Sequence, residues 1–200
     1  MEIEKHIIDG CIRHDRRSQF KLYEHSYPYM MSIALRYRKD QNEAAAVINM
    51  AFLKVLNHLK NFDANQSIRA WMRRILINTI IDEFRKDGKI RKWNVNTDFD
   101  KEISMNGIHV DYNDAESNLH VEQLTEYIHQ LNPLTANVFN LFVLDGYSHK
   151  DVGDLLEISE AASKWHLFTA RKQLQEKIIQ MQRTNESTVV SNIKIKEYEK

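Results

Sequence analysis

Residues 148–174, SHKDVGDLLEISEAASKWHLFTARKQL, predict two short helices joined by a tight turn, and this pair decides the fold. Ser148 can cap the first helix, and Asp151 three positions later can bond back to it in a shortened capping box. Ser159 offers a cap for the second helix, which is expected to run to about Met181. Because so short a turn makes the helices cross steeply, the pattern indicates a helix-turn-helix unit that places one helix in the major groove of DNA.

The second helix of this pair has one side suited to burial and one suited to contact with DNA. A rotation of about 100° per residue predicts a buried stripe made of Ser163, Leu167, Ala170, Leu174 and Ile178. On the other side, Lys164 and Lys172 favour phosphate contact over simple solvation. Trp165 and Phe168 on that side either meet DNA or pack on protein, and packing is the favoured interpretation.

The composition is that of a folded helical chain in a reducing compartment. The 200 residues are 42% hydrophobic and 28% charged, and only two Pro and five Gly argue against an all-β fold. Cys11 is the single cysteine, so an internal disulfide is excluded. No stretch approaches the roughly 20 apolar residues of a membrane span, and no signal peptide is evident. We therefore expect a cytoplasmic protein without membrane insertion.

The net charge of zero conceals a segregated charge pattern. Residues 1–92 carry 18 Lys and Arg against 11 Asp and Glu, whereas residues 93–122 carry one basic side chain against seven acidic ones. This pattern predicts two modules joined by an acidic connector. Because an acidic connector cannot bind phosphates, it either stays in solvent or follows a basic channel of a partner.

Helical periodicity predicts three helices in the front module. Residues 15–38 form the first, which Pro28 bends or restarts, and residues 42–60 form the second. Ser67 caps the third helix, which ends near Lys86. The side of the third helix expected to be buried carries Ile68, Met72, Ile75, Leu76, Thr79 and Ile80.

The rear module is expected to contain four helices that include the helix-turn-helix unit. Asn132-Pro133 separates its first two helices, and Asp145-Gly146 ends the second. The chain as a whole is therefore predicted to be all-α with two small helical domains. The predicted boundaries are 15–88 for the front domain, 89–118 for a flexible acidic linker, 119–182 for the rear domain and 183–200 for a disordered tail.

The third helix carries a row of hydrogen-bonding side chains away from its core side, which we name the polar stripe. Its members are Arg74, Asn78, Asp82 and Arg85, with Trp71 at its edge. Guanidinium groups can hold phosphate or guanine, an amide suits adenine, and an aromatic ring can stack on a base. The alternative, equally weighted from the residues alone, is an exposed face with ion pairs from Asp82 to Arg85 or Lys86.

Separated motifs in both modules resemble one family, the extracytoplasmic-function (ECF) class of bacterial sigma factors. FKLYEHSYPYMMSIALRY, AFLKVLNHLKNF and IRAWMRRILINTIIDEFRK resemble the second conserved region of sigma factors. LNPLTANVFNLFVLDGYSHKDVGDLLEISEAASKWHLFTARKQL resembles the fourth region, and together they cover roughly residues 15–180. The resemblance implies a subunit that binds core RNA polymerase and promoter DNA and directs DNA melting and transcription initiation. It implies no enzyme activity and no cofactor, and it allows an anti-sigma factor as a further partner.

The resemblance also implies three contact surfaces. Core polymerase would bind Asn49, Met50, Leu53 and Lys54. The minus-ten element would contact Phe62, Asp63, Asn65, Ser67, Trp71, Arg74, Asn78, Asp82 and Arg85. The minus-thirty-five element would contact Ser148, His149, Lys150, Ala162, Lys164, Trp165, His166, Phe168, Thr169, Arg171 and Lys172.

Two departures from the family pattern keep other functions in view. Ala45-Ala46 and Asn49-Met50 stand where an acidic pair and Gln-Glu are usual, so a degenerate paralogue with weak polymerase docking is one alternative. Glu157 stands where glycine is usual in the turn, at a cost of about 1 kcal/mol if it is left-handed. A stand-alone helix-turn-helix regulator is a second alternative. An enzyme is disfavoured, because the sequence has no helical His pair for a metal and no glycine-rich phosphate loop.

Overall fold

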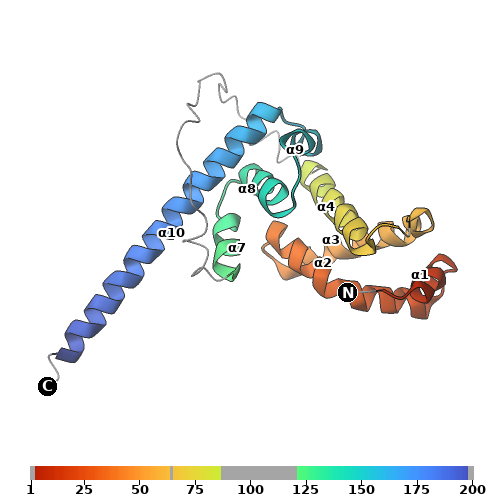
Figure 1. Ribbon diagram of the computed structural model, residues 1–200, viewed down its shortest axis with the longest axis horizontal. Helices are drawn as coiled ribbons and strands as arrows, with labels where there is room; N and C mark the ends of the chain where they lie inside the picture. The colour runs from red at the N-terminus through yellow and green to blue at the C-terminus, as the bar shows by residue number, and fades with distance from the viewer. Residues whose placement is uncertain (1–2, 64, 87–120, 198–200) are drawn as a thin grey trace.

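The computed structural model describes residues 3–63, 65–86 and 121–197, and for 121–122 and 182–197 it describes the backbone alone (Figure 1). Every regular element within these ranges is helical, which confirms the all-α prediction. The expected linker, 89–118, lies outside the described residues. The predicted boundaries of the front domain, 15–88, and of the linker, 89–118, stay a proposal.

Five helical segments form the front module, and their caps explain where three of them begin. The segments are α1 (Lys5–Ile12), α2 (Arg16–Tyr37), α3 (Gln41–His58), a 3-10 turn η1 (Leu59–Asn61) and α4 (Ile68–Lys86). The Asp15 carboxylate accepts from the Ser18 amide at 2.9 Å, and the Asp40 carboxylate accepts from the first-turn amides of α3. The Ser67 hydroxyl accepts from the Ala70 amide at 3.4 Å, as predicted.

Helix α2 continues through Pro28, where a bend or restart was expected. Pro28 lies on the exposed side of the helix, so the carbonyl group that loses its amide partner can bond to water. Helix α1 was not predicted, although Ile7 and Cys11 bury it against the rest of the module. Its eight residues are too few for periodicity to distinguish it from a loop.

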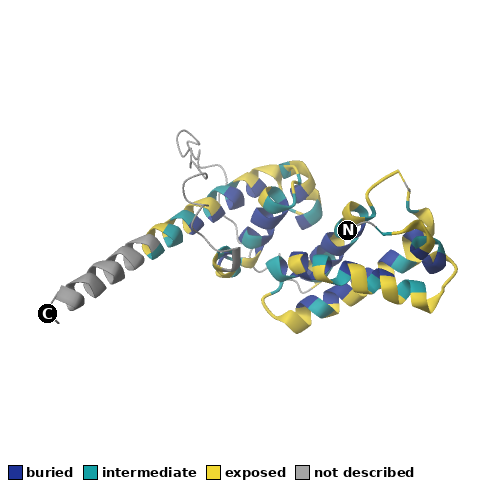
Figure 2. Cartoon of the chain, turned by 60° about the horizontal axis from the view of Figure 1, so that its bottom comes forward, coloured by how far each residue is buried: buried dark blue, intermediate teal, exposed yellow. Residues whose placement is uncertain are grey.

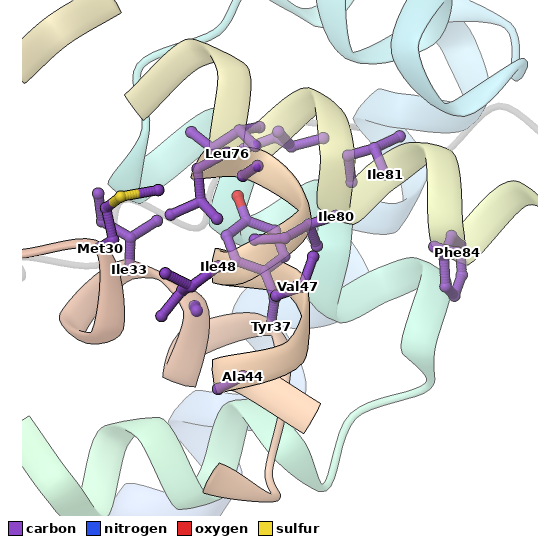
Figure 3. Packing of buried hydrophobic residues seen from close by; sticks show 14 of the residues in the cluster. Met30, Ile33, Tyr37, Ala44, Val47, Ile48, Leu76, Ile80, Ile81 and Phe84 are labelled. Carbon is purple, nitrogen blue, oxygen red and sulfur yellow. The ribbon is translucent and has the colours of Figure 1, made fainter. Parts of the chain in front are cut away.

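The core of the front module lies between α2, α3 and α4 (Figure 3). All three helices contribute side chains that are almost fully buried, among them Met30, Ile33, Val47, Ile48, Leu76 and Ile80. This packing confirms the core side predicted for α4, where Met72, Leu76, Thr79 and Ile80 are buried and Ile68 and Ile75 are half-buried. Each fully buried aliphatic side chain contributes about 1.5–3 kcal/mol of hydrophobic stabilisation.

Helix α4 is buried over more of its circumference than its sequence predicts. Ile77, Ile81 and Phe84 are also at most 3% exposed. At Ile77 the rear module provides a second neighbour, because α9 contacts α4 and Ile77 lines the same cleft as Tyr147 and Leu155. Periodicity within one helix cannot reveal such a second covering surface.

The rear module consists of α7 (Val121–His129), α8 (Pro133–Phe139), a π-helical turn η2 (Asn140–Leu144), α9 (His149–Leu156) and α10 (Glu160–Glu197). The Asn132 side chain accepts from the Leu134 amide at 3.0 Å, so Asn132-Pro133 starts α8 as predicted. Gly146 has φ of +77° and follows the end of η2, which confirms the predicted stop at Asp145-Gly146.

Helix α10 is longer than expected, and it forms the long arm of the molecule in Figure 1. Its backbone is helical to Glu197, although an end near Met181 and a disordered tail over 183–200 were predicted. No glycine or proline occurs between 182 and 197, so nothing in this stretch forces the helix to end. Of the predicted buried stripe, Ser163, Leu167, Ala170 and Leu174 are buried and Ile178 is half-buried. Figure 2 shows buried and exposed residues alternating along this part of α10.

Gly153 on α9 allows the close approach of the helix-turn-helix turn. A Cβ atom at this position would lie 2.8 Å from the backbone oxygen of Ile158. The Ile158 amide donates to the Gly153 carbonyl at 3.0 Å, which holds the two segments together. The turn can therefore fold back on α9 only where the side chain is absent.

We predict that Gly153→Ala destabilises the protein by about 1–3 kcal/mol, because backbone must move to relieve the clash. The control is Gly146→Ala, where a Cβ atom would meet nothing within 4 Å but φ is positive, so a smaller loss of about 1 kcal/mol is expected. Chemical denaturation measures both free energies of unfolding. A loss for Gly153→Ala no larger than for Gly146→Ala would contradict this account.

Candidate nucleic-acid interface

The helix-turn-helix unit has the two caps that its sequence predicts. The Ser148 hydroxyl accepts from the Asp151 amide at 3.1 Å, and the Asp151 carboxylate accepts from the Ser148 amide at 3.2 Å, which forms the capping box. The Ser148 hydroxyl also donates to this carboxylate, and this hydrogen bond is the main cause that lowers the pKa of Asp151. The Ser159 hydroxyl accepts from the Ala162 amide at 3.0 Å at the start of α10.

Two residues predicted to contact the minus-thirty-five element face the protein interior instead. Ala162 is 2% exposed and His166 is 4% exposed, so neither can reach DNA in this structure. His166 lies 2.9 Å from the Thr135 hydroxyl of α8, and burial lowers its pKa to about 4. The prediction was wrong because the buried side of α10 is wider than the stripe assigned to it, since α8 and α9 both cover it.

The other residues predicted for this surface differ in how accessible they are. Ser148, Lys150, Lys164, Arg171 and Lys172 are exposed. His149, Trp165, Phe168 and Thr169 are half-buried. The His149 ring stacks on Phe142 with centroids 4.1 Å apart, and the Trp165 ring meets His166 edge-on. Partial burial and ring contacts support packing as one role of these aromatic side chains.

The polar stripe lies at the surface of α4, and its members also form ion pairs. Arg74, Asn78 and Arg85 are exposed, and the Asp82 side chain is 44% exposed. The Asp82 carboxylate lies 3.9 Å from Arg85 and 3.3 Å from the Lys54 amine of α3. The sequence left two alternatives for this side of α4, an accessible row of polar groups or a face with ion pairs. The structure shows both features on the same residues.

The loop before α4 is anchored to the edge of the polar stripe by two aromatic rings. Phe62 and Trp71 are both half-buried, and their ring centroids are 5.2 Å apart. The Asp63 side chain accepts from the Asn65 amide at 2.9 Å, which turns the loop. Asp63, Asn65 and Ser67 remain exposed, so their polar groups are accessible beside Trp71.

The predicted polymerase-binding residues share an exposed side of α3. Met50 is 40% exposed and Leu53 is 60% exposed, so two large apolar side chains lie side by side at the surface of α3. Asn49 accepts a hydrogen bond from the Tyr23 hydroxyl at 2.8 Å, and Lys54 reaches Asp82. The exposure of apolar side chains on this surface is the property expected of a protein-binding site.

A cluster of four side chains joins the two modules, and sequence reasoning did not find it. The Asp145 cluster consists of Arg36 and Tyr37 at the end of α2, Arg73 of α4 and Asp145 after η2. The Asp145 side chain is 0% exposed and lies 2.8 Å from the Arg36 guanidinium and 2.6 Å from that of Arg73. Tyr37 donates to the same carboxylate. From the sequence, Asp145-Gly146 predicted only the end of a helix. Nothing in the sequence near Asp145 indicated that its carboxylate would contact side chains of α2 and α4.

A cleft of about 620 Å³ runs along the seam next to the Asp145 cluster. One wall belongs to α4 and includes Arg74, Asn78 and Arg85 of the polar stripe. The other wall belongs to the rear module and includes Tyr147, Asp151 and Asp154. Arg85 also forms an ion pair with Glu157, the left-handed residue that ends α9 with φ of 55°.

The fold and these surfaces define an all-α, two-module DNA-binding protein with a helix-turn-helix unit. Residues 22–90 match the family model of Sigma-70 region 2, and residues 121–174 match that of Sigma-70 region 4. The chain belongs to the sigma-70 family, in its ECF class, and is a sigma factor that directs promoter recognition and transcription initiation. This membership decides against the stand-alone regulator considered above.

Curated relatives are distant but similar over most of their length. The ECF RNA polymerase sigma factor SigM of Bacillus subtilis is 24% identical, over 74% of this chain and 85% of the relative. SigX of the same organism is 23% identical, over 77% of this chain and 86% of the relative. A solved structure of the sigma factor RpoE with the anti-sigma factor NepR from Bartonella quintana has a TM-score of 0.49 at 18% identity, covering 80% of this chain and 95% of that one.

Within the described ranges, no helix has the length and apolar character that would let it cross a membrane. The same ranges contain no group of three or more His, Cys, Asp or Glu side chains arranged to hold a metal ion.

We predict that His166 makes stability fall as the pH decreases from about 6.5 to about 4. Its folded pKa is lowered to about 4 from 6.5, so within this window the unfolded state binds a proton that the folded state does not. The loss at pH 4 amounts to about 3 kcal/mol relative to pH 7. Unfolding free energies of the natural protein and of His166→Gln should converge as the pH falls, and equal pH dependence in the two proteins would contradict the assignment.

Proposed function

We propose that the polar stripe and the loop over 62–67 hold the melted strand of the minus-ten element, while the N-terminal half of α10 reads the minus-thirty-five element. One observation carries the first assignment: Arg74, Asn78 and Arg85 are exposed on one side of a helix whose core side, with Met72, Leu76 and Ile80, is fully buried. A helix fixed by its core is a rigid support for side chains that must meet an opened strand.

The chemistry of the front surface suits single-stranded DNA. Arg74 and Arg85 can bind phosphate, Asn78 can bond to base edges, and the Trp71 ring offers a stacking surface. Extruding a base costs a few kcal/mol, which these contacts must offset. Because Phe62 packs on Trp71, it supports the loop and contributes less direct DNA contact than its exposed neighbours Asp63, Asn65 and Ser67.

The rear surface is reduced by the burial of two predicted members. Without Ala162 and His166, the proposed major-groove contacts are Lys164, Thr169, Arg171 and Lys172, together with Trp165 and Phe168 where their rings are accessible. Ser148 and Lys150 at the start of α9 are exposed, and we propose that they contact backbone phosphates. His149 contributes through packing on Phe142.

The partners proposed for this chain are core RNA polymerase, which would dock on Asn49, Met50, Leu53 and Lys54, and promoter DNA. An anti-sigma factor is a further proposed partner. Binding and orientation are the whole contribution of this chain, which performs no covalent chemistry and needs no cofactor in this proposal. A cytoplasmic location follows from the role, since bacterial polymerase acts there.

We predict that Arg85→Ala and Asn78→Ala each reduce open-complex formation roughly tenfold, because each removes one contact to the opened strand worth about 1–3 kcal/mol. Permanganate footprinting with core polymerase on upstream regions of the source genome measures melting. Arg17→Ala is the matched control, because Arg17 is exposed on α2 away from the polar stripe. Unchanged melting in both stripe variants would exclude the polar stripe from the strand-binding surface.

We predict that Lys164→Glu weakens binding to duplex upstream DNA. The slope of log K against the logarithm of the salt concentration should also become smaller by about one, because one phosphate contact is lost. Lys164 is exposed and lies 2.7 Å from Glu160, so the change also removes a helix-surface ion pair of about 0.3–0.5 kcal/mol. Binding of the holoenzyme measured from low to high salt gives the slope. An unaltered slope would remove Lys164 from the DNA-binding face.

A further inference from the structure

A second cleft, of about 420 Å³, lies between the front module and α7 and α8 of the rear module. We name it the Arg38 cleft, because Arg38 at the end of α2 lines it together with Met50 of α3 and Leu131 before α8. Its volume is in the range of about 300–1,000 Å³ that small-molecule sites have in proteins. Of its lining residues, only Met50 belongs to a binding surface proposed above.

A large part of the lining of the Arg38 cleft is apolar. Val47, Phe84 and Leu131 are at most 5% exposed, and they line the cleft from three separate segments of the chain. Ala46 of α3 and Ala136 of α8 each contribute only a methyl group, so their short side chains leave room in the cleft. An apolar group of a ligand can therefore be shielded from water here.

Arg38 brings a charge to this apolar lining that no described carboxylate balances. Its guanidinium is half-buried and forms no ion pair with any of the described residues. Among these residues it donates to the carbonyl groups of Tyr37 at 3.3 Å and of Ile80 at 3.4 Å, and both distances are longer than those of ordinary N–H···O hydrogen bonds. Since a guanidinium has five N–H donors, further donors remain for an anion.

The other basic side chains of the cleft already have partners. Arg36 forms an ion pair with Asp145, and Lys39 forms one with Glu126. His129 lies 2.8 Å from a backbone carbonyl through Nε2. None of these three groups therefore needs a ligand to satisfy it.

The two carboxylates that line the cleft are also accounted for. Glu83 lies 3.1 Å from the Lys86 amine, which balances its charge. Glu43 belongs to the first turn of α3, where the helix dipole favours a negative charge. The charge of Arg38 is thus the one that a bound anion would balance.

We propose that the Arg38 cleft binds a small organic anion. Its carboxylate or other acidic group pairs with Arg38, and its apolar body, a ring or a short hydrocarbon chain, packs on Val47, Phe84 and Leu131. Arg38 makes the site selective for an anion, because a charge-assisted hydrogen bond is about twice as strong as a neutral one. The site involves no DNA contact and does not depend on the roles proposed for the polar stripe or for α10.

Equilibrium dialysis of the full chain with naphthoate tests the site, because this probe joins a carboxylate to an apolar double ring. We expect saturable binding at one site with a Kd of about 1 mM or lower, which contacts of ordinary quality provide for a molecule of this size. Naphthalenemethanol, which has the same ring and no charge, should bind roughly tenfold more weakly. Absence of saturable naphthoate binding would overturn the proposal.

Arg38→Gln separates the effect of the charge from that of the apolar lining. This variant should bind naphthoate roughly tenfold more weakly, whereas its affinity for naphthalenemethanol should equal that of the natural chain, because the apolar lining is unchanged. Arg69→Gln is the matched control, since Arg69 is exposed on α4, lies over the Tyr29 ring and does not line the cleft. Equal naphthoate affinity of the natural chain and Arg38→Gln would rule out the anion site.

The methionines report where the probe binds. Met50 lines the cleft, whereas Met30 and Met72 are at most 1% exposed in the front core. In a chain labelled at its methionine methyl groups, the naphthoate ring should shift the NMR signal of Met50, which Met50→Leu identifies, and leave those of Met30 and Met72 unchanged. Binding that leaves the Met50 signal in place would locate the probe elsewhere and refute the assignment.

A larger side chain in the cleft should exclude both probes. Ala46 is exposed and lines the cleft, so Ala46→Leu should abolish measurable binding of naphthoate and of naphthalenemethanol. Ala161→Leu makes the same change at an exposed position of α10 outside the cleft and should leave both affinities unchanged. Undiminished binding by Ala46→Leu would count against this cleft as the site.

Discussion

The arrangement of the two modules depends on one buried carboxylate. Asp145 has no exposed side-chain surface, and a charge in that position is tolerated only because two guanidinium groups and a phenol surround it. Removing one member of such a group typically costs about 3–5 kcal/mol, since the remaining charges stay buried without compensation. The seam is therefore specific, because no other contact described between the modules combines full burial with three partners.

Helix α4 brings folding and function onto a single element. Leu76 and Ile80 hold it in the front core, Arg73 holds the rear module, and the polar stripe remains accessible along the cleft. One rigid helix therefore holds the core contacts, the contact with the rear module and the polar stripe in fixed positions relative to one another.

Glu157 combines an unfavourable backbone conformation with an ion pair to the other module. A left-handed residue other than glycine costs about 1 kcal/mol, and an exposed ion pair such as that with Arg85 returns at most a similar amount. The two effects roughly cancel, so the pair does not stabilise the turn appreciably. The effect of the ion pair is instead that a carboxylate of the rear module lies next to the Arg85 guanidinium.

The sequence by itself determined the features that depend on neighbours three or four positions away: the caps at Ser67, Ser148 and Ser159, the helix break at Asn132-Pro133, the helical modules and the polar stripe. Only the tertiary structure decided which surfaces become covered by segments distant in the chain. Ile77, Ala162 and His166 are buried because other helices lie on them, and Asp145 meets partners from α2 and α4. The spacing of apolar residues predicts the side of a helix that packs in the core of its own module. A second side that is covered by another helix shows no such regular spacing, so the sequence does not predict it.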